Sequence, residues 1–383
     1  MSDSLSRHAQ LAGRDLSQVD ATGAICGGAM LDDAKLEQTV FRDADLAGAS
    51  LRRVDAGQAC FTNALLEDAN LQDARLRFAD FADAVMDGAD LTGADLWGAR
   101  MTGVVAHRAI LRGTILDEVH LEGGDLDGAD LTGARIRRAH LAGARLRGCN
   151  LRDAVFEGTD LAGADLSMAI LPHVVLTGCD LRHAKFAGAW LERTRMRAHQ
   201  LGGAAGEEIA GDHAAAIESY IVLEQNFRSL GNAPDASWAF RRRRRMGKHL
   251  NLAHARGALG GARLGAAGVA ALRWLSDVSS EALCDYGESL TRILRALAIV
   301  LVGCALLYWW TGTLEPRVPL GRNRLAAVDY LLFSLDSMTS VGTGEVALRP
   351  AGQLGVLISS LQTVAGTVLL GLFGFVLGVR MRN

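Results

Sequence analysis

The stretch that decides the fold of the first half of the chain is residues 69–96, ANLQD ARLRF ADFAD AVMDG ADLTG ADL. A large apolar side chain recurs at every fifth residue of this stretch, and a small one, usually alanine, stands two residues before each. Leu, Phe, Met or Ile fill the apolar series from Leu31 to Leu201, except at Ala56 and Ala106. A period of five is neither the 3.6 of an amphipathic helix nor the two of a plain strand. The register does not slip, which excludes a chance origin.

Two inward residues in every five require the chain to turn a corner once per unit and to coil around an axis. The pattern, as in Ala89-Asp90-Leu91, resembles A(D/N)Lxx of the pentapeptide-repeat family. This resemblance implies a right-handed quadrilateral β-helix with four units in each coil. Over residues 9–201 it predicts roughly nine or ten coils and a rod of about 45 Å, at ~4.8 Å per coil.

The predicted rod presents long flat faces that suit contact with an unknown protein or ligand. Some members of the family resemble DNA in shape and charge and bind type II topoisomerases. Residues 1–201 carry 22 Lys+Arg against 29 Asp+Glu, a balance of −7 with arginines interleaved. This mixture favours a scaffold or sensor over a DNA mimic, so no nucleic-acid partner is expected.

Composition gives no sign of an enzyme. The whole chain of 383 residues carries a net charge of −3, so residues 202–383 carry +4. The six cysteines show no CxxC pairing and the ten histidines no HExxH spacing, so no cofactor or resident metal is predicted. The stretch MSDSLSRHAQLAGRD lacks the basic and apolar regions of a signal peptide, so the part before the first membrane span is expected to be cytoplasmic.

A helical hairpin connector is predicted over residues 207–251. Apolar spacing indicates a helix over His213–Leu230 that ends at Gly231, and a second helix that begins at Asn232 or Asp235. The segment FRSLGNAPDASWAF is similar to the helix–turn–helix of one tetratricopeptide-like unit. One such unit is too small to stand alone, so we expect it to cap the β-helix or to pack between subunits.

A run of five arginines follows in the second helix: Arg241, Arg242, Arg243, Arg244 and Arg245. One interpretation is a positive-inside cluster or a solvated helix face. The other is contact with anionic lipid headgroups. Residues 252–289 form a juxtamembrane segment, in which Ala253–Leu275 is interpreted as an interfacial helix or as a short re-entrant or coiled element. Residues 285–288, DYGE, resemble a segment of bacterial proteins that fuse pentapeptide repeats to a two-helix channel.

Two membrane spans are predicted within residues 290–383. The outer helix covers about 291–311 and ends in Tyr308, Trp309 and Trp310, an aromatic belt. The inner helix, 354–379, contains no charged residue and is followed by Arg380 and Arg382. Arginines flank the start of the first span and the end of the second. By the positive-inside rule, this predicts cytoplasmic N- and C-termini for a multi-pass protein of the inner (plasma) membrane.

Between the spans, a short pore helix is predicted over 326–338, followed by a glycine-containing filter. The filter residues are Thr339, Ser340, Val341, Gly342, Thr343 and Gly344, with Glu345 at its mouth. The segment is similar to the potassium-channel signature T-x-V-G-Y-G-D. The resemblance implies an all-α two-transmembrane pore-loop channel domain, assembled as a homotetramer, in which backbone carbonyls replace the hydration shell of a permeant ion. Glycine suits such a filter because it accepts unusual backbone torsions.

Two departures from the signature leave the selectivity open. Thr343 stands where Tyr or Phe is usual, and Glu345 stands where Asp is usual. We therefore predict a K⁺ channel, with a non-selective monovalent channel for K⁺ and Na⁺ as one alternative and a membrane-anchored tetrameric scaffold as another. Gly366 is the predicted gating hinge. The alternative is close helix packing through the glycines further along the span: Gly371, Gly374 and Gly378.

Overall fold

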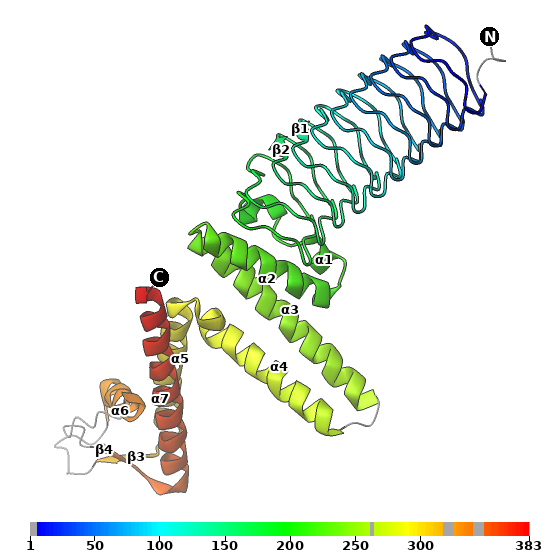
Figure 1. Cartoon of the computed structure of the whole chain (residues 1–383). Helices are drawn as coiled ribbons and strands as arrows, with labels where there is room; N and C mark the ends of the chain where they lie inside the picture. The colour runs from blue at the N-terminus through cyan, green and yellow to red at the C-terminus, as the bar shows by residue number, and fades with distance from the viewer. Residues whose placement is uncertain (1–5, 261–263, 317–324, 340–347, 383) are drawn as a thin grey trace. The chain divides into compact units, whose positions relative to one another are not determined.

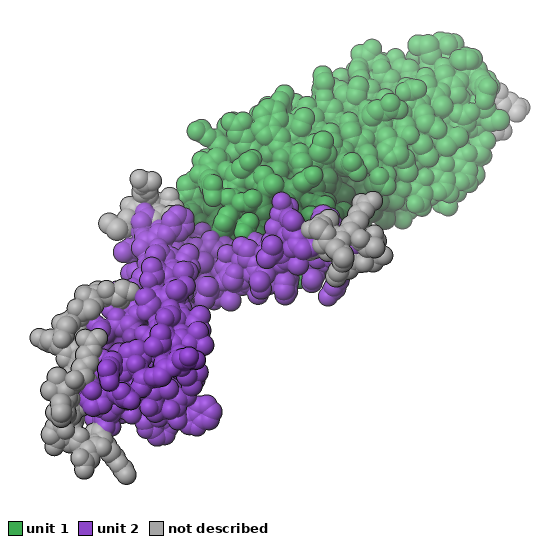
Figure 2. All heavy atoms as spheres, turned by 90° about the horizontal axis from the view of Figure 1, so that it is seen from below, with its two compact units in different colours: residues 1–250 green, residues 251–383 purple. Residues whose placement is uncertain are grey.

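The computed structural model of the chain describes residues 6–260, 264–316, 325–339 and 348–382 (Figure 1). Two compact units divide the chain, Met1–Leu250 and Asn251–Asn383, and Figure 2 gives each its own colour. The first unit holds the repeat and most of the helical connector. The second holds the two apolar helices.

The repeat coils into a four-sided β-helix. Every fifth residue forms a parallel bridge to the residue twenty positions ahead, from Gln10 to Met30 through to Val175 and Arg195. One 20-residue coil therefore carries four bridges, one on each side. At one place the bridges widen into two short parallel strands, β1 (Arg135–Arg137) and β2 (Val155–Glu157). The coiling predicted from the five-residue period, and the four-sided β-helix that the family resemblance implies, are confirmed.

The large apolar series fills the interior of the coil, and the small series lines it where the walls approach closely. Phe41, Phe61 and Phe81 stack in successive coils, with ring centroids 5.4 and 4.8 Å apart. Threonine is tolerated in the small series because its hydroxyl donates to a backbone carbonyl, on the preceding coil for Thr39, Thr159 and Thr194 and within its own turn for Thr114. Thr159 Oγ1, for example, donates to the Ile136 carbonyl at 2.6 Å. The interior is thus apolar, and its buried hydroxyls are hydrogen-bonded.

Each corner is a tight turn, which explains the Asp or Asn of the motif. The Ala34 N–H donates to the Leu31 carbonyl at 2.9 Å, and the turn's third residue, Asp33, has a φ of 57°. An aspartate at the bridge position accepts the N–H two residues on, as Asp90 Oδ1 does from Thr92 at 2.9 Å. This is a local side-chain turn that Asp and Asn favour.

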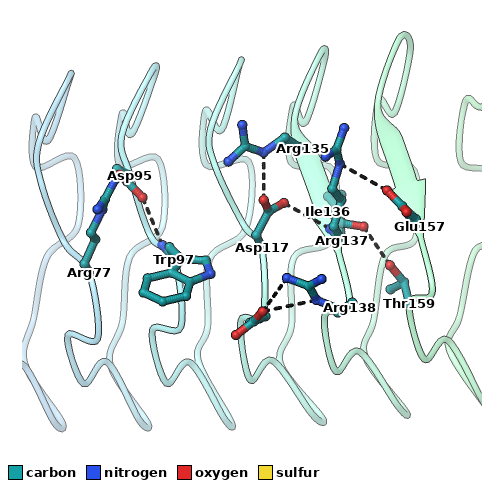
Figure 3. Close-up of polar contacts among 11 residues, drawn as sticks. Arg77, Asp95, Trp97, Asp117, Arg135, Ile136, Arg137, Arg138, Glu157 and Thr159 are labelled. Atoms are coloured by element: carbon teal, nitrogen blue, oxygen red, sulfur yellow. Dashed lines mark hydrogen bonds and ion pairs between the residues drawn. The ribbon is translucent and has the colours of Figure 1, made fainter.

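Oppositely charged side chains link neighbouring coils on the outside of the β-helix (Figure 3). Arg77 Nε lies 2.6 Å from Asp95 Oδ2, and Arg135 Nε lies 2.8 Å from Asp117 Oδ2. Arg138 contacts Glu118 at 2.6 Å. The acidic excess of the repeat is therefore interrupted by paired arginines.

A set of short and long helices follows the last coil. These are η2 (Ala198–Leu201), α1 (Gly206–Ile209), α2 (His213–Ser229) and α3 (Ala233–Gly260). Leu230 ends α2, and Gly231 follows with a φ of 68°. The apolar face of α2 joins the core of the β-helix through three buried side chains: Tyr220, Leu223 and Phe227. The helices therefore extend the core past the final coil.

In its described residues, the second unit holds helices and one small antiparallel pair of strands. Its elements in order are α4 (Leu264–Cys284), η3 (Asp285–Gly287), α5 (Leu290–Thr311), β3 (Leu314–Pro316), α6 (Ala327–Thr339), β4 (Leu348–Pro350) and α7 (Gly352–Arg382). Strands β3 and β4 pair between the end of α5 and the start of α7. Helices α5, α6 and α7 pack on one another, and Tyr308 meets Phe333 edge-on at 5.2 Å.

Candidate functional site

Helices α5 and α7 are long and apolar enough to cross a membrane, over Leu290–Thr311 and Gly352–Gly378. Large apolar side chains on both remain uncovered within the chain. Ile299 is 71% exposed, Trp310 is 81% exposed and Phe375 is 66% exposed. An apolar surface of this extent marks a region that contacts lipid, another protein chain or both.

A buried polar network joins α5, α6 and α7. The Tyr308 hydroxyl donates to Gln362 Oε1 at 3.1 Å. Gln362 Nε2 donates to the carbonyl and the hydroxyl of Ser334, at 2.8 and 2.6 Å. The Ser334 hydroxyl in turn donates to the Leu301 carbonyl at 2.7 Å. The three bonds of Gln362 are buried and the bond from Ser334 to Leu301 is partly buried, so the network fixes the position of α6 against both long helices.

The C-terminal end of α6 also lies directly on α7. Thr363 Oγ1 donates to the Ser337 carbonyl at 2.9 Å. Gly366, one turn further along α7, lies against the backbone of α6. A Cβ added to Gly366 would lie 2.2 Å from the Met338 carbonyl oxygen. By contrast, a Cβ on Gly371 or Gly374 would meet no atom of the described residues within 4 Å. Gly366 is therefore a packing position, and its role as a hinge stays a prediction.

The predicted filter begins at the last residue of α6. Thr339 ends the helix, and its hydroxyl donates to the Leu335 carbonyl at 2.9 Å. The remaining predicted residues lie outside the described residues: Ser340, Val341, Gly342, Thr343, Gly344 and Glu345. The network described above thus holds the helix that leads into this segment.

Sequence reasoning did not single out Gln362 or Ser334. The sequence does contain a feature that could have identified Gln362, because this amide side chain lies inside an apolar run that has no charged residue. A polar side chain in such a run is costly unless it has a partner within the protein, which is a reason to expect a role for it.

The arginine run lies on α3, and two of its members make ion pairs within the first unit. Arg242 Nη1 lies 2.7 Å from Glu208 Oε1, and Arg243 Nε lies 3.0 Å from Glu224 Oε2. These pairs tie α3 to α1 and α2. Contact of the run with lipid headgroups stays a prediction.

A further cluster, not foreseen from the sequence, caps the last coil. Glu207 Oε1 accepts the N–H groups of Phe186 and Ala187, both at 2.9 Å, and the Ser219 hydroxyl at 2.7 Å. Asn226 Nδ2 donates to the Thr194 carbonyl at 2.8 Å. A final coil has no next coil to pair with, so these side chains supply the missing partners. The helices cap the β-helix.

Two buried ionisable groups of the first unit have raised pKa values, Cys149 in the repeat and Tyr220 on α2. Burial raises the pKa of the Cys149 thiol to about 12, so it stays protonated at neutral pH. Burial, together with a hydrogen bond to Glu208, raises the pKa of Tyr220. In the described parts of the chain, no group of three or more His, Cys, Asp or Glu residues is placed to hold a metal ion.

The sequence of the β-helix matches the model of a known protein family. Residues 29–197 match pentapeptide repeats in 8 copies, over 29–68, 69–105, 105–133, 134–171 and 159–197. This chain belongs to the pentapeptide-repeat family. The family match covers most of the β-helix and leaves the two-span unit of this pentapeptide-repeat protein outside its bounds.

Solved structures of other pentapeptide-repeat proteins are similar to part of the chain. HetL, involved in heterocyst differentiation regulation in the cyanobacterium Nostoc sp. strain PCC 7120, is 31% identical. That match covers 50% of this chain and 89% of HetL, with a TM-score of 0.43. The Nostoc protein alr5209 is 31% identical over 35% of this chain and 84% of its own, with a TM-score of 0.21.

A trypsin-treated variant of QnrB1, a plasmid-mediated fluoroquinolone resistance protein, is 19% identical. That match covers 51% of this chain and 97% of the variant, with a TM-score of 0.24. No curated protein matches the chain.

Proposed function

We propose that four copies of this pentapeptide-repeat protein form a cation-conducting pore in the inner (plasma) membrane. In this proposal α5 and α7 cross the bilayer, α6 enters it part-way, and residues 339–344 line the ion path. Both termini lie in the cytoplasm, where the β-helix receives an unknown signal that gates the pore.

The observation that carries the proposal is the way α6 is held. A 13-residue helix is too short to span a bilayer, yet it is fixed between two span-length helices by the Gln362 network and by Gly366. Its C-terminal end stops at Thr339, directly before a segment with two glycines spaced as in a carbonyl-lined filter. A helix C-terminus carries partial negative charge, which favours a nearby cation.

The permeant ion we propose is K⁺. Backbone carbonyls around Gly342 and Gly344 would replace its hydration shell. Thr343 removes the aromatic ring usual at its position, so conduction of both K⁺ and Na⁺ is the alternative that the selectivity test must separate. The pore requires no cofactor other than its permeant ion.

Reconstitution into liposomes tests the proposal. The full chain is expected to pass K⁺ down a gradient, and Gly342→Ala is expected to reduce the flux about tenfold or more while the tetramer persists, because the added methyl disturbs the carbonyl-lined path. Gly303→Ala on α5 is the matched control, since a Cβ there meets no atom within 4 Å in the part of the chain that the structure describes. A wild-type chain that passes no ion, or a Gly342→Ala chain with full flux, contradicts the pore.

A membrane-anchored tetrameric scaffold is the second candidate, favoured by the outer surface of the β-helix. Phe78 and Trp97 form an edge-on aromatic pair there, with centroids 4.7 Å apart, and Phe78 is half exposed. Exposed aromatic side chains are common at protein interfaces. If Gly342→Ala leaves cellular function intact while Phe78→Ser abolishes it, the scaffold accounts for the protein and the pore does not.

A further inference from the structure

The junction between α4 and α5 carries unusual backbone strain. Outside the β-helix, Asp285 and Tyr286 are the only residues other than glycine with positive φ in the described parts of the chain, at 51° and 59°. Gly287 follows at 93°. In the β-helix such torsions recur at the third residue of a turn, but a tyrosine in this region is disfavoured and needs a cause in its surroundings.

Several contacts hold the junction bent. The Ser289 N–H donates to the Cys284 carbonyl at 3.0 Å, and the Ser289 hydroxyl caps α5 at Arg292. Arg292 Nη1 donates to the Glu281 carbonyl at 2.7 Å and lies 3.7 Å from Asp285. These contacts join the end of α4 to the start of α5 and stabilise the bend between them. We refer to residues 284–289 as the elbow.

The elbow packs on the C-terminal part of α7. Cys284, Ile293 and Val376 form one small buried cluster, in which Cys284 is 6% exposed and Val376 is fully buried. Leu372 and Phe373 border it. In the proposed topology this part of α7 is the cytoplasmic end of the inner helix, where the mouth of the pore would lie.

We propose that the elbow is a two-state element that regulates the pore, an inference that rests on the proposed function. In the bent state Asp285, Tyr286 and Gly287 keep left-handed torsions, and Cys284 covers Val376. In the straight state the three residues take helical torsions, α4 and α5 become one continuous helix, and Cys284 leaves α7. The strain lowers the free-energy difference between the two states, so a pull on α4 from the cytoplasmic side can change how α7 is held.

Two substitutions shift this balance in opposite directions. Gly287→Ala penalises the bent state through its backbone alone, since a Cβ at Gly287 meets no atom of the described residues within 4 Å. Tyr286→Gly removes strain from the bent state and disfavours the straight helix. Each is expected to change the ratio of the two states on the order of tenfold. Gly268→Ala is the matched control, because Gly268 has open space, lies within α4 and lacks a positive φ.

The accessibility of Cys284 distinguishes the bent from the straight state, and it can be measured whether or not the protein conducts ions. Its thiol is buried in the bent state, so its labelling rate with a maleimide, read by peptide mass spectrometry on the reconstituted full chain, follows the straight population. Labelling is expected to be about tenfold faster in Gly287→Ala, slower in Tyr286→Gly and unchanged in Gly268→Ala. Cys149, buried in the β-helix, is the internal reference in every variant.

Liposome flux measured on the same samples separates the possible failures. Opposite changes of flux in Gly287→Ala and Tyr286→Gly, in step with labelling, support the regulation. Equal labelling in all variants overturns the elbow as a two-state element. Shifted labelling with unchanged flux in a conducting protein overturns its coupling to the pore. Shifted labelling in a protein that never conducts supports the elbow but rejects the proposed pore.

Discussion

In the β-helix a repeat of five residues closes a core from its own chain, whereas α5 and α7 leave most of their apolar surface uncovered. Successive coils bury their large series almost completely, and the final coil is closed by Glu207 and Asn226. The second unit buries a few side chains around Tyr308 and a few around Val376. The first unit therefore carries the information for its fold within each coil. The second leaves an apolar surface that, in the proposed function, contacts lipid and other copies of the chain.

The largest expected effect comes from removing an interior aromatic ring of the β-helix. Phe61→Ala empties the space between Phe41 and Phe81 and is expected to cost about 3–5 kcal/mol of unfolding free energy. Phe375→Ala, on the exposed side of α7, is expected to change that free energy by less than about 0.5 kcal/mol. Denaturant unfolding of the full chain in detergent, followed by circular dichroism, measures both. Equal losses of unfolding free energy in the two variants would contradict the difference between a first unit that buries its apolar side chains and a second unit that leaves them exposed.

A smaller effect is expected where the second unit is tightly packed. Gly366→Ala places a methyl against the Met338 carbonyl and is expected to destabilise the α6–α7 contact by about 1–3 kcal/mol, with loss of ion flux. Gly371→Ala, which has open space in the chain, is the control. Thermal unfolding in detergent and liposome flux measure the outcome. Wild-type stability with altered gating would favour the predicted hinge over packing.

The smallest effect concerns a pH-dependent clamp between coils. His107 Nδ1 lies 3.1 Å from Asp87, and His107 Nε2 lies 3.2 Å from Asp125. Burial lowers the pKa of His107, but hydrogen bonds to Asp125 and Asp87 outweigh it, so the pKa is raised above 6.5. Since the folded pKa exceeds the unfolded one, the stabilisation is complete below pH 6.5 and is lost as the pH rises through the folded pKa.

The clamp is tested with His107→Gln, which is expected to unfold more easily than wild type at pH 5.5 and equally at pH 9. The side chain is more than one-third exposed, so the difference stays below about 1 kcal/mol. Denaturation midpoints at the two pH values measure it. A difference that grows with pH would contradict the assigned sign.

The fold of the β-helix was predictable because each unit repeats the same local chemistry. The apolar series, the small series and the Asp or Asn at the bridge position each occupy a fixed place in the unit, so the structure of one unit predicts that of the others. The α2–α3 turn was predictable for a similar reason, since Gly231 supplies the left-handed torsion that ends α2.

A cap was one of the two roles expected of the helical connector, but the residues that make it were not predictable from local pattern, and neither were the Gln362 network and the elbow. A glutamate such as Glu207 is normally expected at the surface. Its burial results from its hydrogen bond with the Phe186 N–H, a tertiary contact that the local sequence does not predict. Gln362 and Ser334 lie 28 positions apart and meet only through helix packing. Tyr286 has no preference for a left-handed torsion, so only the contacts of the bent junction explain it.

Single-channel recording of the purified full chain in a planar bilayer, with K⁺ on one side and Na⁺ on the other, tests the central claim most directly. The account predicts discrete openings with a reversal potential displaced towards that of K⁺, and their disappearance in Gly342→Ala. A silent bilayer containing the intact tetramer would contradict the pore. Openings that reverse near zero would retain the pore and contradict its preference for K⁺.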